Sequence, residues 1–220
     1  MSFSTVLSAA IEGLSAEFVH VEADVSNGLP VFHMVGYLSS EVKEAGERVR
    51  TAIRNAGFDY PPKRTVINLS PAALRKRGAS FDLPIAVSIL ISLGMVNPGR
   101  AGSCLLVGEL GLDGTVRKVP GVLPIVMEAG RKGIRCCIVP GENAVEGALI
   151  NDVEIIGVTD LKEAVDFLNG KRKIPAAAPE YSFREQRPDV DFGDIQGQET
   201  VKRAAEIAVA GGHNLLLIGP

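Results

Sequence analysis

The stretch FDLPIAVSILISLG, residues 81–94, is apolar on nearly every side of a helix. A helix without a polar face has no side to turn toward water, so it lies buried in the core of a domain. Asp82 and Pro84 fall in its first turn, where a carboxylate suits the helix dipole and proline removes no hydrogen bond. The stretch therefore predicts a central buried helix, around which strands and further helices must pack.

Four strands are predicted ahead of this helix, at residues 4–13, 16–30, 31–38 and 63–72. Between the third and the fourth strand, Ser39 or Ser40 caps a helix that runs to about Asn55, because apolar residues recur there at helical spacing. Charged side chains form a stripe along the opposite, polar face of that helix.

After the buried helix the chain alternates between strands and helices. A hairpin is predicted to turn at Asp113 and Gly114. Helices and strands then follow at residues 120–132, 134–139, 153–158 and 160–168, with a short helix after residues 142–147. Strands gathered early and β-α-β units late indicate an α/β fold, an α+β sandwich that spans residues 1–170.

The composition changes after residue 170. Residues 171–190 hold three prolines and many charges without any period, which predicts a linker. Residues 198–210 then predict a helix, and Leu215–Ile218 a buried strand. We therefore expect an N-terminal domain at 1–170, a linker at 171–190 and the start of a second domain at 191–220.

Charge is distributed unevenly along the chain. The net charge is −3, yet residues 41–77 carry nine Lys or Arg against four acids, a local charge of +5. A positive surface of this kind permits an anionic partner, whereas the low aromatic content of 5% gives no support to stacking on single strands. The candidate DNA contacts are Lys43, Arg50, Arg54, Arg75, Lys76 and Arg77.

Metal and membrane sites are not predicted. Cys104, Cys136 and Cys137 have neither the even number of a disulfide framework nor the spacing of a zinc site, and the two adjacent cysteines should point to opposite faces of a strand. None of the three histidines has a partner at metal-ligand spacing. No signal peptide or membrane-spanning stretch is evident, so we expect a cytoplasmic protein without a membrane partner.

The stretch DIQGQETVKRAAEIAVAGGHNLLLIGP, residues 194–220, resembles the start of the AAA+ module of the ComM/YifB family, the magnesium-chelatase-like ATPases. Residues 26–90 resemble the N-terminal domain of the same family. In that family the last residues lead into a phosphate loop, whose backbone N–H groups wrap the phosphates of ATP. The resemblance implies a partial ATP site at Ile195, Gly197, Gln198, Gly219 and Pro220.

The phosphate loop of such a module is not completed within these 220 residues, because its lysine and its magnesium-binding Ser or Thr would follow Pro220. We therefore expect a P-loop AAA+ domain that is truncated here. ATP and Mg²⁺ are the cofactors expected of the full-length protein, and neither should bind detectably to this chain. Taken without the resemblance, Gly197 and Gln198 read as a turn that starts a helix.

The family's N-terminal domain in turn resembles the proteolytic domain of Lon, which pairs a nucleophilic serine with a lysine base. Ser80, in the turn RKRGAS, falls on the serine position and Leu123 on the lysine position. A serine hydroxyl is a weak nucleophile unless a base takes its proton, and leucine cannot do so. Lys118 lies near in sequence but precedes the helix. We therefore predict no catalytic residue and no peptidase activity, and we assign Ser80 as the N-cap of the buried helix.

The resemblance implies a subunit of a hexameric AAA+ ATPase that acts on branched DNA in natural transformation and recombination. Two alternatives stay open: a protein-remodelling or chelatase-type AAA+ subunit, and an oligomerisation scaffold. Chelation itself is disfavoured, because the ATPase subunits of true magnesium chelatases are not expected to carry a Lon-like N-terminal domain. Any ATPase activity is expected of the full-length homo-oligomer.

Overall fold

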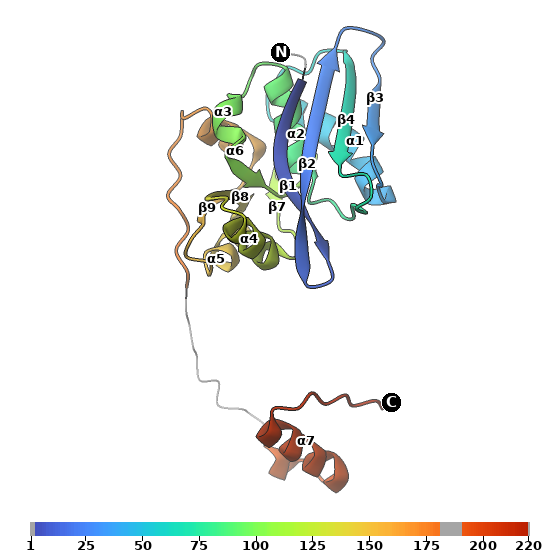
Figure 1. The fold of residues 1–220 in the computed structure, drawn as a ribbon, viewed down its shortest axis with the longest axis vertical. Coiled ribbons are helices and arrows are strands. Elements are labelled where there is room, and N and C mark those ends of the chain that lie inside the picture. Colours follow the sequence, from blue (N-terminus) through green and yellow to red (C-terminus); the bar gives the residue numbers. More distant parts are fainter. Residues whose placement is uncertain (1–2, 181–190, 220) are drawn as a thin grey trace. The chain divides into compact units, whose positions relative to one another are not determined.

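The computed structural model describes residues 3–180 and 191–219. The second half of the predicted linker lies outside these ranges, as does Pro220 of the predicted ATP site. The chain divides into two compact units, Met1–Glu180 and Tyr181–Pro220, and each is described by itself (Figure 1).

A sheet of seven strands forms the centre of the first unit, in the order β3-β4-β2-β1-β5-β8-β9 (Figure 1). The strands are β1 (Phe3–Glu12), β2 (Ser15–Ser26), β3 (Phe32–Val35), β4 (Arg64–Ser70), β5 (Cys104–Leu106), β8 (Cys136–Pro140) and β9 (Glu154–Val158). β2 pairs antiparallel with β1 and with β4, and the other neighbours in the sheet are parallel. A separate hairpin joins β6 (Glu109–Leu110) to β7 (Val116–Arg117), as predicted.

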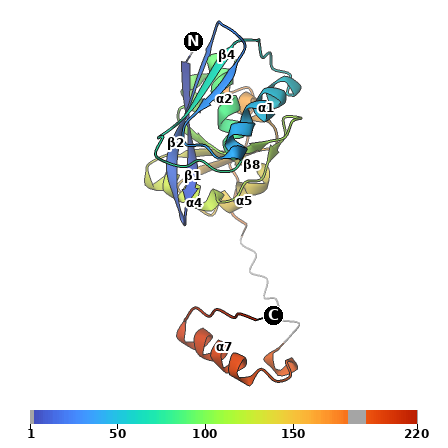
Figure 2. The same ribbon diagram turned by 90° about the vertical axis from the view of Figure 1, so that its right-hand side faces the viewer.

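Helices pack against the sheet (Figures 1 and 2). They contribute to two buried apolar clusters. The first cluster draws on α1 (Ser40–Asn55), α2 (Asp82–Ser92), α3 (Pro98–Ala101) and α6 (Leu161–Leu168), and the second on α4 (Val122–Arg131) and α5 (Ala144–Gly147). Cys136 packs against the first cluster and Cys137 belongs to the second. This confirms that the adjacent cysteines point to opposite faces of their strand, and the fold is the predicted α/β type.

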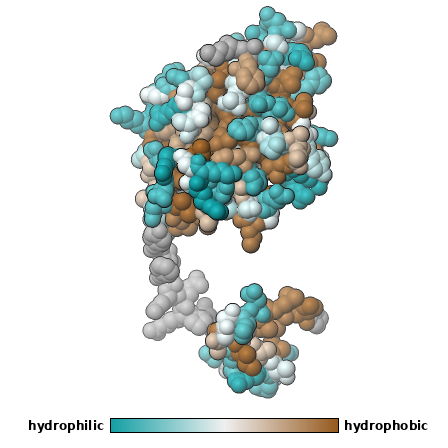
Figure 3. Space-filling model, viewed as in Figure 1, coloured by the Kyte–Doolittle hydropathy of each residue, from teal (hydrophilic) through white to brown (hydrophobic). Residues whose placement is uncertain are grey.

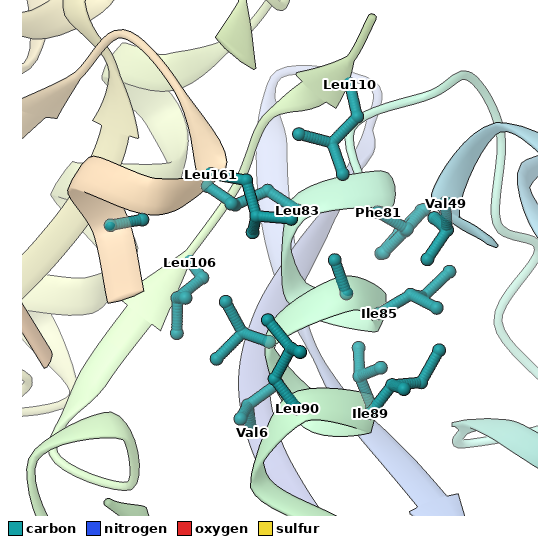
Figure 4. Packing of buried hydrophobic residues seen from close by; sticks show 14 of the residues in the cluster. Val6, Val49, Phe81, Leu83, Ile85, Ile89, Leu90, Leu106, Leu110 and Leu161 are labelled. Carbon is teal, nitrogen blue, oxygen red and sulfur yellow. The ribbon is translucent and has the colours of Figure 1, made fainter. Parts of the chain in front are cut away.

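Helix α2 is the buried helix that the sequence predicts. All eleven of its residues are buried, and Figure 4 shows Leu83, Ile85, Ile89 and Leu90 packed among side chains from β1, α1, β5 and α6. Fully burying a side chain of this size stabilises the fold by about 1.5–3 kcal/mol. Helix α2 therefore packs both against β1, near the start of the domain, and against α6, near its end.

The assignment of Ser80 as the N-cap of α2 is wrong. The helix begins at Asp82 with Phe81 as its N-cap, and no side chain caps it. A turn delays the helix, because Asp82 N donates to Ala79 O (3.1 Å) while the carbonyl of Ser80 accepts from Gly108 N (2.9 Å). Ser80 therefore lies in the loop that precedes the helix.

The second unit contains a 3₁₀ turn, η2 (Phe192–Asp194), and one helix, α7 (Glu199–Gly211). The predicted buried strand is not formed, since Leu215–Ile218 has no strand conformation and its side chains are 45% to 89% exposed. A strand needs a neighbour for its backbone N–H and C=O groups, and residues 191–219 offer none. Apolar side chains remain at the surface of this unit, which Figure 3 shows in brown.

Candidate functional site

Ser80, at the Lon serine position, lies half-buried at a cavity of about 290 Å³. The turn that carries it is held to the loop after β5, because Gly108 donates to Ser80 O and Gly108 O accepts from Leu83 N (3.0 Å). Gly78 has a φ of +74°, in the left-handed region that favours glycine. These constraints fix where the serine stands relative to the buried helix.

The cavity beside Ser80 is mostly apolar, with Ile11, Val119 and Ile125 among its walls. Its only charged lining residues are Arg77 and Glu109, and no lysine or histidine lines it. A carboxylate and a guanidinium do not reproduce the amine base of the Lon dyad. The charged residues that line the cavity therefore differ from the amine of the Lon dyad.

Leu123, at the Lon lysine position, does not line this cavity. It lies in the first turn of α4, where its backbone N–H donates to Glu146 Oε1 (3.1 Å). Lys118 is exposed and does not line the cavity either. No side-chain amine is thus among the residues that line the Ser80 cavity, and the absence of peptidase activity stays a prediction.

Asn143 positions the part of the cavity wall that leads into α4, formed by Val119 and Pro120. Asn143 was not predicted as a site residue. Asn143 is fully buried, its Oδ1 accepts from Val119 N (3.0 Å) and its Nδ2 donates to Val119 O (3.0 Å) and Glu146 Oε2 (3.1 Å). Glu146 in turn accepts from Leu123 N. Asn143 and Glu146 have the i, i+3 spacing of a capping box, but the Asn143 side chain does not cap α5, so this spacing does not predict its bonds to Val119.

A partly buried ion pair between Arg48 and Asp82 fixes the first turn of α2 and was also missed. Arg48 donates to both oxygens of Asp82, from Nε (2.9 Å) and from Nη2 (3.0 Å), and Leu110 N approaches Asp82 Oδ2 at 3.3 Å. The bond to Asp82 raises the pKa of Arg48. Burial raises the pKa of Asp82, and its bonds to Arg48 oppose that rise. The pair ties α1, α2 and β6 together behind the Ser80 turn.

The basic turn at residues 75–77 turns its middle side chain inward. Arg75 and Arg77 are exposed, with the Arg75 guanidinium 5.6 Å from the ring centre of Tyr37, whereas Lys76 is 0% exposed. The backbone of Lys76 bridges to Leu38, and successive side chains of an extended segment point to opposite sides. Lys76 Nζ donates to Pro71 O. Lys76 is therefore not a DNA contact, which corrects the sequence-based prediction.

Replacing Lys76 by methionine should raise the free energy of unfolding by about 1 kcal/mol or more, because a buried charge is exchanged for apolar volume. Burial lowers the pKa of Lys76 below its ordinary value, so the wild type gains stability as pH rises from the folded-state pKa toward the unfolded-state pKa. The advantage of the variant should thus shrink between neutral and alkaline pH, as measured by urea unfolding. Lys118→Met on an exposed lysine is the control, and equal effects from both would contradict the prediction.

The remaining DNA candidates separate into two groups. Lys76 pairs with Leu38 just before α1 begins, which places Arg75 and Arg77 near the N-terminal end of that helix. Arg54 lies in its last turn, and a helix of 16 residues is about 24 Å long. Arg50 and Arg54 meet at a second cavity, and Lys43 is exposed along the same helix.

In the second unit, Gly197 and Gln198 form the turn that starts α7. Both are left-handed, with φ of +73° and +59°, and Gln198 is the N-cap. The left-handed conformation costs a non-glycine residue such as Gln198 about 1–2 kcal/mol. Ile195 is 39% exposed, and Gly219 follows a segment that forms no strand. Residues 191–219 therefore display parts of the predicted nucleotide site without assembling a phosphate loop.

No group of three or more His, Cys, Asp or Glu side chains within residues 3–180 and 191–219 is arranged to hold a metal ion. Of the helices in the described ranges, none is both long and apolar enough to cross a bilayer.

A mostly parallel sheet with a buried helix behind a serine-bearing turn defines a Lon-protease-like domain. Lon protease 1 of Sorangium cellulosum is 28% identical over 76% of this chain, a match that covers 22% of that protein. The domain thus has the Lon architecture, while its cavity lacks the amine of the Lon dyad.

Family models and close relatives give a narrower assignment. Residues 21–143 match the model for subunit ChlI of Mg-chelatase, and residues 191–220 match the model for magnesium chelatase, subunit ChlI. Competence protein ComM of Haemophilus influenzae is 41% identical and the uncharacterized protein YifB of Escherichia coli 42% identical, each across the whole of this chain. The chain belongs to the ChlI family of magnesium-chelatase-like proteins, together with ComM and YifB. It spans 44% and 43% of the length of those two relatives.

Proposed function

We propose that this chain is the N-terminal part of an AAA+ ATPase that remodels branched DNA during natural transformation and recombination. The observation that carries the proposal is the 41% identity to a competence protein, which extends across both units of the chain. Exposed cations at Lys43, Arg54, Arg75 and Arg77 give the first unit the means to contact DNA phosphates. The proposal includes a cytoplasmic homo-hexamer.

ATP and Mg²⁺ belong to this proposal as cofactors of the longer protein. The match of residues 191–220 to a magnesium-chelatase model supports a nucleotide site that starts here. The exposed apolar residues of Leu215–Ile218 and of α7 fit a domain whose remaining strands pack on them. Ile195, Gly197 and Gln198 would lie on the adenine side of such a site, and Gly219 and Pro220 at the start of its phosphate loop.

An electrophoretic shift assay on the full-length protein tests the DNA partner. Duplex and branched DNA should both be bound at low salt, with an affinity that falls as salt rises. Arg75→Ala/Arg77→Ala should weaken that binding by about tenfold, because two phosphate contacts are lost. Lys162→Ala/Lys173→Ala removes the same charge from two exposed lysines elsewhere and should leave it unchanged.

A full-length protein that binds neither DNA at low salt would overturn the proposal. That outcome would favour a protein-remodelling or chelatase-type subunit, or an oligomerisation scaffold. Equal weakening by both double variants would show a general charge effect in place of a contact at the 75–77 turn.

A further inference from the structure

A second cavity of about 260 Å³ lies between α1, the loop before β3 and the loop before β4. Three cations line it: Arg50 and Arg54 from α1, and Lys63 from the loop before β4. Arg50 and Arg54 are one turn apart on the helix, so their side chains share a face. No carboxylate is among the residues that line the cavity.

The positive charge at this cavity is incompletely neutralised. Arg50 Nη1 contacts Glu47 Oε1 at 3.1 Å, but Glu47 is 84% exposed and does not line the cavity. The Nε of Arg50 is buried and has no hydrogen-bond partner within the described residues. Neither Arg54 nor Lys63 has a carboxylate oxygen within 4.0 Å in the part of the chain that the structure describes. A buried donor without an acceptor costs free energy, and an oxyanion relieves that cost only when the Arg50 side chain moves, because water does not reach its Nε in this structure.

Part of the cavity wall is restrained. Pro30 and Pro62 line it, and proline restricts the backbone. Tyr60 is fixed by a 2.7 Å hydrogen bond between its hydroxyl and Thr65 Oγ1. Burial raises the pKa of Tyr60, while its bond to Thr65 and the nearby Arg50 and Arg54 guanidiniums oppose that rise. A neutral phenol thus stands beside the cations, and the parts of the wall formed by Pro30, Pro62 and Tyr60 are restrained before a ligand binds.

We propose that this cavity binds a phosphate group, with Arg50, Arg54 and Lys63 as its ligands. Guanidinium groups match the oxygens of phosphate in pairs, and Lys63 adds a compact charge. A stripe of solvated cations would explain Arg54 alone, but it does not explain why Arg50, Arg54 and Lys63 line one cavity that has no carboxylate among its lining residues. The phosphate comes from the DNA backbone or from a free phosphate ester; the first source rests on the proposed function.

The site is tested on this chain by NMR titration with inorganic phosphate and with pyrophosphate. The Nε–H resonance of Arg50 should shift and saturate. Arg50→Ala/Arg54→Ala should weaken binding, followed through the backbone amides of Tyr60, Lys63, Arg64 and Thr65, by at least about tenfold. Lys162→Ala/Lys173→Ala is matched in charge and should bind as the wild type does. No saturable shift, or equal loss in both double variants, overturns the site.

Binding of duplex DNA by the full-length protein, compared with binding of pyrophosphate, decides the source of the phosphate. If Arg50→Ala/Arg54→Ala weakens both pyrophosphate and duplex binding, the ligand is the DNA backbone. If it weakens only pyrophosphate binding, the ligand is a free phosphate ester, and the site stands even where the proposed DNA function fails. Unchanged binding of both probes overturns the assignment of the two arginines. Circular dichroism spectra like those of the wild type show that the variants are folded.

Discussion

Replacing Arg48 by alanine is expected to lower the free energy of unfolding by about 3–5 kcal/mol, the cost of stranding a buried carboxylate. Asp82 is 0% exposed, and Arg48 donates to both of its oxygens. After the substitution the amide of Leu110, at 3.3 Å, is its one remaining hydrogen-bond donor in residues 3–180. Urea unfolding followed by circular dichroism measures the loss.

The loss should depend on pH in a defined direction. Burial already raises the pKa of Asp82, and removal of Arg48 removes the main opposing influence, so the pKa rises further in the variant. A carboxyl group with a raised folded-state pKa loses stability as pH rises through the unfolded-state value toward the folded-state value. The gap between variant and wild type should therefore be wider at pH 7 than at pH 4.

The matched control is Glu44→Ala, because Glu44 also approaches Arg48. Its oxygen lies 4.0 Å from Arg48 Nη1 and its side chain is 72% exposed, so water screens the pair and the expected change is under about 1 kcal/mol. An Arg48→Ala variant as stable as Glu44→Ala would show that the Asp82 carboxylate is reached by water and does not depend on its partner.

The order of strands and helices could be predicted from sequence because each element is specified locally. The helical period of Val42, Ala45, Val49 and Ile53 predicts α1, and the absence of any polar face predicts the burial of α2. The segment Leu215–Ile218 shows the limit of this reasoning. Its apolar run has strand propensity, but a strand exists only beside another, and residues 191–219 provide no neighbour.

The site was harder to predict because its contacts join distant parts of the chain. Arg48 and Asp82 are 34 residues apart, and nothing in either segment specifies the other as its partner. The inward direction of Lys76 follows from its bridge to Leu38, which the run of three basic residues does not reveal. Arg50 and Arg54 could be found from helical spacing, whereas the addition of Lys63 required the folded loop.

Replacing Asn143 by alanine is expected to cost about 3 kcal/mol, since two buried backbone groups would lose their partners. Val119 is 2% exposed, and its N–H and C=O both bond to the Asn143 side chain. Alanine can neither accept nor donate in their place. Because Val119 and Pro120 line the Ser80 cavity, the substitution should also loosen that wall. Urea unfolding measures the first effect, and hydrogen exchange at the Val119 amide measures the second.

Glu142→Ala is the control for this prediction, because Glu142 is the exposed neighbour of Asn143 and should change stability by less than about 0.5 kcal/mol. In that control the Val119 amide should exchange as slowly as in the wild type. An Asn143→Ala variant that loses less than about 1 kcal/mol and keeps a protected Val119 amide would mean that water or another group replaces the carboxamide. The start of α4 would then hold its position without Asn143, and the wall of the Ser80 cavity would depend on apolar packing alone.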